Sequence, residues 1–163
     1  MSAIAQFHVV PGDRLAEVLA AAAPQRRGWF RAAHDSFRQV LRGAGRELET
    51  FAWSGWVFNT LDLYLESRHG LMYGSSGDSA ASRQLSAARG SYWLVLPQGG
   101  AAELLAALES IKLDSGDLTA FIAAEHGPAA DPDEVTAVQA ALTTLKAWLA
   151  QVPPQWVGLL SVG

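Results

Sequence analysis

The sequence predicts an α/β (α+β) fold, in which a small mixed sheet that includes both terminal strands is covered by about five or six helices. Alternating apolar segments at the two ends of the chain predict the strands, and amphipathic segments between them predict the helices. The chain has 163 residues, of which 50% are hydrophobic and 17% are charged. This size and composition are typical of one folded unit, so we expect residues 1–163 to form a single globular domain.

Three segments have the pattern of strands. In AIAQFHVV, near the N-terminus, apolar residues such as Phe7 alternate with Gln6 and His8, which predicts a strand with one apolar and one polar face. The C-terminal WVGLLSVG is almost wholly apolar and predicts a buried strand. SYWLVLP predicts a third short strand or an extended lead into the next helix. We expect the two terminal strands to pair in one sheet.

Six segments have helical periodicity, with apolar residues three or four positions apart. In chain order they are RLAEVLAAAA, RRGWFRAAHDSFRQVLRG, VFNTLDLYL, GGAAELLAALESI, DSGDLTAFIAAEHG and DPDEVTAVQAALTTLKAWLAQV. The last one has a capping pattern at its start, DPDE, and a Pro-Pro pair after its end. The stretch between the third and fourth helices, residues 70–91, is rich in Gly, Ser and Ala, and it predicts a long flexible loop.

Residues 51–70, FAWSGWVFNTLDLYLESRHG, fit either a domain core or the rim of an active site. The segment is apolar on most sides, which favours a buried central helix. Burying an aromatic side chain removes ~150–250 Å² from water, so the Trp residues beside apolar segments should lie in the core. These are Trp53, Trp56, Trp93, Trp148 and Trp156. Trp29 lies in an Arg-rich segment, and it is the Trp that we expect to be exposed and able to bind a partner.

The charge distribution limits the classes of partner. The chain has a net charge of −4, which argues against a general affinity for nucleic acid. Residues 99–163 hold two Lys and eight acidic residues, which could form a face for a basic protein partner or simply a solvated surface. There is no Cys, and no apolar run approaches the ~20 residues that cross a bilayer. We therefore expect no membrane association and a cytoplasmic location.

The ionisable residues give few candidates for catalysis. The histidines His8, His34, His69 and His126 are not spaced to bind one metal, so we predict no metal and no cofactor. Asp62 is flanked by large apolar residues, which would raise its pKa and suit a general acid or base. Alternatively, Asp62 and Glu66 form the polar stripe of their helix. If the protein is an enzyme, Asp62, His69 and His34 are the residues to test first.

Three segments together resemble the YfbM-like family of small bacterial proteins. They are SAIAQFHVVPGDRLAEVL, WSGWVFNTLDLYL and LKAWLAQVPPQWVGLLSVG, in this order along the chain. The resemblance implies a mixed α/β fold, and it brings no established activity and no catalytic residues. The Gly/Ser/Ala-rich stretch and the Arg-rich residues 26–46 depart from the family pattern.

Two functions remain as hypotheses. The first is a non-catalytic bacterial module that binds a protein partner or associates with itself, such as an immunity-type or regulatory protein. The absence of a catalytic motif, the acidic C-terminal third and the many aromatic residues favour it. The second is a small hydrolase or ligand-binding enzyme with a pocket around Asp62, His69 and His34. The sequence leaves enzymatic activity open and favours the non-catalytic alternative.

Overall fold

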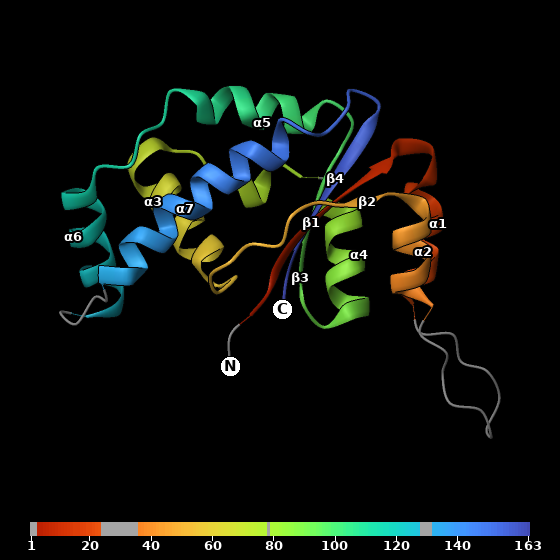
Figure 1. The fold of residues 1–163 in the computed structure, drawn as a ribbon, viewed down its shortest axis with the longest axis horizontal. Helices are drawn as coiled ribbons and strands as arrows, with labels where there is room; N and C mark the ends of the chain where they lie inside the picture. Colours follow the sequence, from red (N-terminus) through yellow and green to blue (C-terminus); the bar gives the residue numbers. More distant parts are fainter. Residues whose placement is uncertain (1–2, 24–35, 78, 128–131) are drawn as a thin grey trace, which may run out of the picture.

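The computed structural model describes residues 3–23, 36–77, 79–127 and 132–163 (Figure 1). These residues form one antiparallel sheet of four strands in the order β2-β1-β4-β3. The strands are β1 (Ala5–Pro11), β2 (Arg46–Glu47), β3 (Tyr92–Leu96) and β4 (Trp156–Val162). The two terminal strands are the central pair, since β1 pairs with β4 along its whole length, from Ala5 opposite Val162 to Pro11 opposite Trp156. The predicted fold class, including the pairing of both terminal strands, is confirmed.

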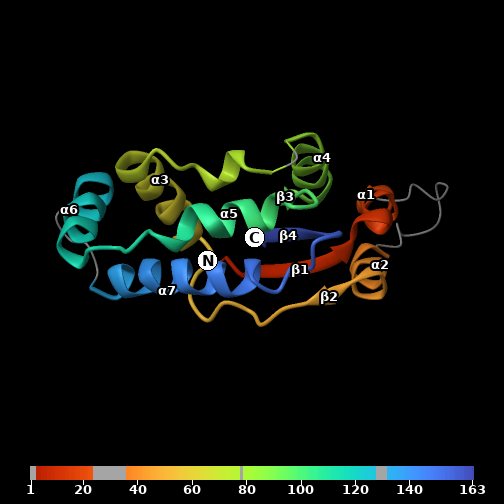
Figure 2. The ribbon, with the colours of Figure 1, turned by 90° about the horizontal axis from the view of Figure 1, so that it is seen from above.

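The described residues also contain seven α-helices, one more than the expected upper number. They are α1 (Leu15–Ala22), α2 (Phe37–Ala44), α3 (Val57–His69), α4 (Ser79–Arg89), α5 (Gly100–Glu109), α6 (Ser115–His126) and α7 (Pro132–Leu149), with short 3-10 turns η1 (Gly12–Arg14) and η2 (Tyr73–Ser75). Figure 1 shows α1, α2 and α4 on one side of the sheet and α3, α5, α6 and α7 on the other. In Figure 2, α5 and α7 run side by side over the sheet. The fold is therefore a sheet between two helical layers.

Helix α4 corrects the prediction of a loop over 70–91. Ala81 and Leu85 of this helix are buried four positions apart, which is one helical turn. The hydroxyl oxygens of Ser82 and Ser86 accept hydrogen bonds from the backbone N–H groups of Val95 and Trp93, each at 2.9 Å. Because β3 is an edge strand, these N–H groups have no neighbouring strand on that side. The Ser residues whose composition predicted a loop thus hydrogen-bond to β3 and allow a helix to cover the sheet edge.

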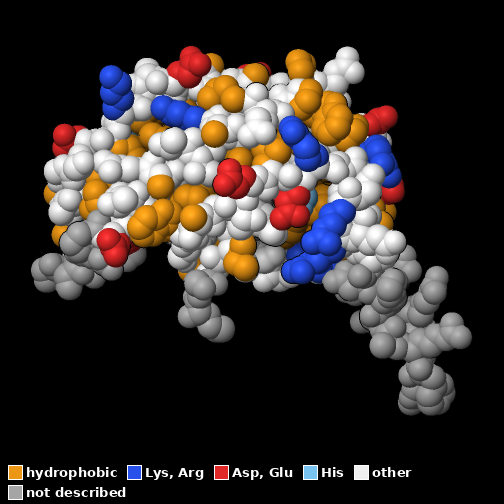
Figure 3. Space-filling view, viewed as in Figure 1, with side chains coloured by type: hydrophobic (Ala, Val, Ile, Leu, Met, Phe, Trp, Pro, Cys, Tyr) orange, Lys and Arg blue, Asp and Glu red, His pale blue; other side chains and the backbone are white. Residues whose placement is uncertain are grey.

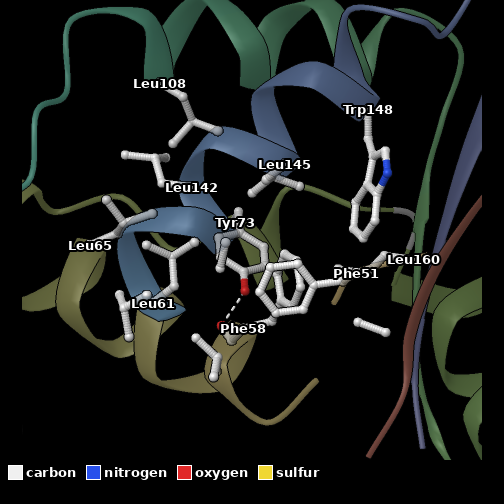
Figure 4. Close-up of a cluster of buried hydrophobic side chains, with 14 of the residues drawn as sticks. Phe51, Phe58, Leu61, Leu65, Tyr73, Leu108, Leu142, Leu145, Trp148 and Leu160 are labelled. Carbon is white, nitrogen blue, oxygen red and sulfur yellow. Dashed lines mark hydrogen bonds between the residues drawn. The ribbon is translucent and has the colours of Figure 1, made fainter. Parts of the chain in front are cut away.

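The larger hydrophobic cluster lies between the sheet and the helices α3, α5 and α7 (Figure 4). At its centre, the Trp148 ring stacks between Phe7 and Phe58, with ring centroids 5.5 Å apart on both sides. The Trp148 indole N–H donates to the backbone carbonyl of Glu49 at 3.0 Å. The Tyr73 hydroxyl donates to the backbone carbonyl of Phe58, as the dashed line in Figure 4 marks. Every polar group of these rings is therefore hydrogen-bonded inside the cluster.

The Trp residues divide differently from the prediction. Trp93 and Trp148 are buried, as expected, and Trp156 is partly buried. In contrast, Trp53 is 39% exposed and Trp56 is 59% exposed, so the prediction that both lie in the core is wrong. Both residues precede the first residue of α3, Val57, and they belong to the segment that leads into the helix. The buried side of residues 51–70 is formed instead by Phe51, Phe58, Leu61, Tyr64 and Leu65.

Candidate functional site

One sheet face changes from apolar to polar along its strands. This is the face that α1, α2 and α4 cover, and its apolar end is formed by Val10, Val157 and Leu159. Towards the N-terminus of β1, the same face carries His8 and then Gln6. The strand register places Glu47 of β2 opposite His8 and Ser161 of β4 opposite Gln6. Because residues paired across antiparallel strands point to the same side, four polar side chains gather at this end of the sheet.

A cavity of about 380 Å³ lies over these side chains. Its floor is formed by the polar residues of the sheet, and its walls by α2 and by the residues that join α4 to β3. Figure 3 shows basic and acidic side chains close together over the region of α2, α4 and β2, which borders the cavity. Trp93 and Phe37 also line it and provide an apolar wall, in which their rings pack edge to face at 5.6 Å.

His8 is the most unusual residue of the cavity. It is only 4% exposed, and its Nδ1 atom is buried without a hydrogen-bond partner among the described residues. Its Nε2 atom lies 3.7 Å from Oε2 of Glu47, and the other carboxylate oxygen of Glu47 accepts a hydrogen bond from the Gln6 amide at 2.7 Å. Buried polar atoms are almost always hydrogen-bonded, so a buried nitrogen without a partner is an exception that marks His8 as more than a packing residue.

Burial lowers the pKa of His8 below its ordinary value of 6.5, because an imidazolium ion is poorly solvated inside the protein. The Glu47 carboxylate opposes this effect and raises the pKa, whereas the nearby Arg42 lowers it further. His8 is therefore a neutral imidazole near pH 7, with one ring nitrogen that donates and one that accepts hydrogen bonds.

Three arginines line the cavity. Arg38 and Arg42 lie one turn apart on α2 and are exposed to solvent. Arg89 ends α4, and its guanidinium group lies 4.6 Å from the centre of the Phe37 ring. With Glu47 as the carboxylate of the lining and His8 neutral, positive charge exceeds negative charge there. The arrangement suits an anion, because guanidinium groups bind carboxylates and phosphates through paired hydrogen bonds.

The residues that the sequence selected for catalysis lie elsewhere or outside the described residues. Asp62 is half-buried on α3 and lines a second, smaller cavity together with Tyr73 and Tyr92. His69 is exposed at the last turn of α3, where its ring lies 6.1 Å from the ring of Tyr64. His34 and Trp29 fall outside the described residues. Of the three residues predicted to line one pocket, Asp62 lines a cavity and His69 is exposed at the surface, while His34 lies outside the described residues.

Sequence reasoning placed Gln6 and His8 on one strand face but did not identify them as a site. The available signal was the polar face of a strand near the N-terminus of the chain. Glu47 could not be connected with His8, since the two are far apart in sequence and β2 is only two residues long.

Among the described helices, none combines the length and the apolar character needed to cross a membrane. Comparisons of the chain with protein-family models, with curated proteins and with solved structures give no match. The resemblance to the YfbM-like family therefore stays a prediction.

Proposed function

We propose that this protein binds a small anionic molecule in the cavity between the sheet and α2. The observation that carries the proposal is that three arginines line a cavity whose floor includes His8, a buried histidine whose Nδ1 atom has no hydrogen-bond partner among the described residues. The volume of about 380 Å³ falls within the ~300–1,000 Å³ that is usual for small-molecule sites.

The lining also indicates the chemistry of the ligand. Arg38 and Arg42 lie at the solvent-exposed side and would bind its carboxylate or phosphate group. Trp93 and Phe37 would contact an apolar or aromatic part of the ligand. The polar side chains of the sheet that line the floor, such as Gln6 and Ser161, would hydrogen-bond a polar group of the ligand that reaches the sheet. The ligand that fits best is a small aromatic or apolar anion.

The role proposed here is binding rather than covalent catalysis. A nucleophilic serine needs a base within hydrogen-bond distance. Ser161 and Ser91 line the cavity, yet the His8 ring is paired with Glu47 through Nε2, and no described residue accepts or donates a hydrogen bond at Nδ1.

A thermal-shift experiment tests the proposal with phenyl phosphate and benzoate, and with benzyl alcohol as the neutral control, all at one ionic strength. A ligand that binds the folded state raises the Tm, by an amount equivalent to ~2.7 kcal/mol at a concentration a hundredfold above its Kd. We expect the anions to raise the Tm and benzyl alcohol to leave it unchanged.

Matched arginine variants locate the effect. Replacing Arg38 and Arg42 together by Gln should abolish the shift, because both line the cavity. The single variants Arg38→Gln and Arg42→Gln should each weaken the shift. Arg46→Gln removes the same single charge from exposed β2, next to Glu47 but outside the cavity lining, and it should keep the shift. Equal shifts for anions and benzyl alcohol, or equal loss in both kinds of variant, would contradict the proposal.

We also retain protein binding as a second candidate, because one surface feature favours it. Trp53 and Trp56 line an open groove of about 510 Å³ with Asp133 and Glu134 of α7. These two acidic residues belong to the acidic C-terminal third, so the groove pairs aromatic surface with negative charge and would suit a basic protein segment.

Affinity capture from the native host at low and high salt tests this second candidate. A basic partner should be retained at low salt and released at high salt, since exposed charges are screened. Trp53→Ala should lose the partner, whereas Ile4→Ala, which removes another exposed apolar side chain, should keep it. Sedimentation of the purified protein measures self-association, and a monomer that captures no partner would exclude the candidate.

A further inference from the structure

A second cavity, of about 110 Å³, lies on the opposite face of the sheet, between α3, η2 and the edge strand β3. Four aromatic rings line it, together with Asn59, Asp62 and Val162. The rings of Trp56 and Tyr92 are at its exposed rim, 59% and 43% accessible to solvent. Phe58 and Tyr73 are buried, and the hydrogen bond from the Tyr73 hydroxyl to the Phe58 carbonyl holds these two together. This aromatic-lined cavity, with two buried rings on one side and two exposed rings at its rim, is called the cage below.

Asp62 supplies the charge of the cage. Its Oδ1 atom accepts a hydrogen bond from the backbone N–H of Gly74 at 3.3 Å. A Cβ atom on Gly74 would lie 2.7 Å from Oδ2 of Asp62 and 3.2 Å from the Tyr92 hydroxyl oxygen. The carboxylate and this hydroxyl thus both lie beside Gly74, where the absence of a side chain leaves room for them. Neither the cavity lining nor the ion pairs of the described residues provide a cation for Asp62.

The environment of Asp62 is that of a carboxylate in need of a counter-ion. Burial raises its pKa, and the negative charge of Glu66 adds to this rise, while the backbone N–H groups of Gly74 and Tyr73 partly oppose it. Burial, together with the charge of the same carboxylate, raises the pKa of Tyr92 to about 12, so the Tyr92 hydroxyl stays protonated. A bound cation would offset the unfavourable burial of the Asp62 charge.

We propose that this cage binds a methylated ammonium group, held by the aromatic lining, in particular the exposed rings of Trp56 and Tyr92, and by the Asp62 carboxylate. Aromatic faces attract cations, and methyl groups on nitrogen can pack against the rings, whereas a plain ammonium ion loses more hydration on entering. A single carboxylate is a poor site for Ca²⁺ or Mg²⁺, which need six or more oxygen ligands or retained waters. The small volume limits the occupant to a head group, carried either by a free metabolite or by a methylated lysine.

Titration followed by NMR tests the proposal with tetramethylammonium, choline and ammonium chloride, and with 3,3-dimethylbutanol, the uncharged analogue of choline. We expect the first two to shift the indole N–H signal of Trp56 and the amide signal of Gly74. The uncharged analogue should bind at least about tenfold more weakly, and ammonium should cause no saturable shift. A trimethyllysine peptide and its unmethylated form are titrated in parallel, and tighter binding of the peptide than of choline assigns the group to a protein.

Two charge variants on α3 distinguish a specific contact with Asp62 from a general effect of negative charge. Asp62→Asn keeps the shape of the side chain and should weaken choline binding about tenfold or more. Glu66→Gln removes the same charge one turn further along α3, outside the cavity lining, and should retain most of the affinity. Trp56→Ala removes an exposed wall and should also weaken binding, and a circular dichroism spectrum checks that each variant folds.

Three results would overturn the proposal. They are no saturable shift with either methylated cation, equal binding of choline and its uncharged analogue, and equal weakening by Asp62→Asn and Glu66→Gln. The anion cavity lies on the other face of the sheet, so binding of phenyl phosphate by the same variants is independent of each of these results.

Discussion

Phe7 and His8 are neighbours on β1 and point to opposite faces of the sheet, and both are almost completely buried. On the Phe7 side, the aromatic stack with Trp148 fills the space, and its polar groups are hydrogen-bonded. On the His8 side, a cavity remains and the Nδ1 atom has no partner among the described residues. Burial alone therefore does not separate core from site, whereas the hydrogen bonding of the buried polar atoms does.

The difference extends over both faces. The strand residues that face α3, α5 and α7 are apolar along the central pair. They are Ala5, Phe7 and Val9 on β1, and Leu160 and Val162 on β4. The face towards α2 is apolar at one end and carries Gln6, His8 and Ser161 at the other. One face therefore contributes mainly stability, and we expect the polar end of the other to contribute mainly function.

The largest expected effect is on the filled face. Trp148→Ala should lower the free energy of unfolding by about 3–5 kcal/mol, because it removes a buried ring between Phe7 and Phe58 and leaves a cavity. Trp56→Ala, at an exposed position, should change it by less than about 0.5 kcal/mol. Urea unfolding followed by circular dichroism measures both, and similar losses in the two variants would contradict the contrast between these Trp residues.

A glycine under Phe7 tests how tightly the same face is filled. A Cβ atom at Gly158 would lie 2.6 Å from Cζ of Phe7, so Gly158→Ala should destabilise the protein by about 1–3 kcal/mol. At Gly43, within α2, a Cβ atom meets nothing within 4 Å, and Gly43→Ala should stabilise the protein by about 0.5–1 kcal/mol. Equilibrium unfolding of both variants gives the two signs, and a neutral Gly158→Ala would show that the face is loosely packed.

His8→Leu tests the opposite expectation for the polar end. An apolar side chain of similar size removes an unpartnered polar group, so the free energy of unfolding at pH 7.5 should change by less than about 1 kcal/mol. In the wild type, stability should fall as the pH decreases below 6.5, because the unfolded chain binds a proton that the folded state resists, and it should level off below the lowered pKa of folded His8.

The pH effect of His8 is isolated by the difference between wild type and variant. Unfolding curves for both proteins from pH 5 to pH 7.5 cancel the contributions of the other titratable groups. A difference that rises with pH over the window below 6.5 is expected, and a difference independent of pH would show that burial does not lower the pKa of His8.

The smallest expected effects concern the charges around His8. Glu47→Gln should lower the His8 pKa further, because the carboxylate stabilises the imidazolium form, and Arg42→Gln should raise it. Both shifts can be followed by NMR titration of the ring protons of His8. Shifts of the same sign in the two variants would mean that these side chains do not face His8 as the cavity geometry requires.

Much of the fold could be predicted from local patterns. The alternation around Phe7 and His8 predicted β1 and its two faces, and the periodicity of Leu142, Leu145 and Leu149 predicted α7. Helix α4 was missed because its Ser and Ala residues show little apolar periodicity. Only the structure shows that its Ser hydroxyls accept hydrogen bonds from the edge strand β3. Trp53 and Trp56 were wrongly assigned to the core because an apolar neighbourhood in sequence does not fix which side of a helix start faces the sheet.

The candidate sites were less predictable than the fold. Asp62 was selected for its apolar neighbours, and the structure does place it in a cavity, yet with Tyr73 and Tyr92 rather than beside His69. His8 was visible as a polar residue on a strand, but its pairing with Glu47 and its closeness to Arg42 arise from segments more than thirty residues away. Such contacts depend on which elements pack together, and no local pattern encodes them.

The sequence by itself predicted the class of fold, a sheet that includes both terminal strands, and the two faces of β1, because the period of apolar residues follows directly from strand and helix geometry. Only the tertiary structure decided that one face closes around Trp148 while the other leaves a charged cavity at His8. The physical reason is that the burial of a residue and the charges around it depend on residues that are distant along the chain and close only in the folded protein. Secondary structure, in contrast, depends largely on residues close in sequence.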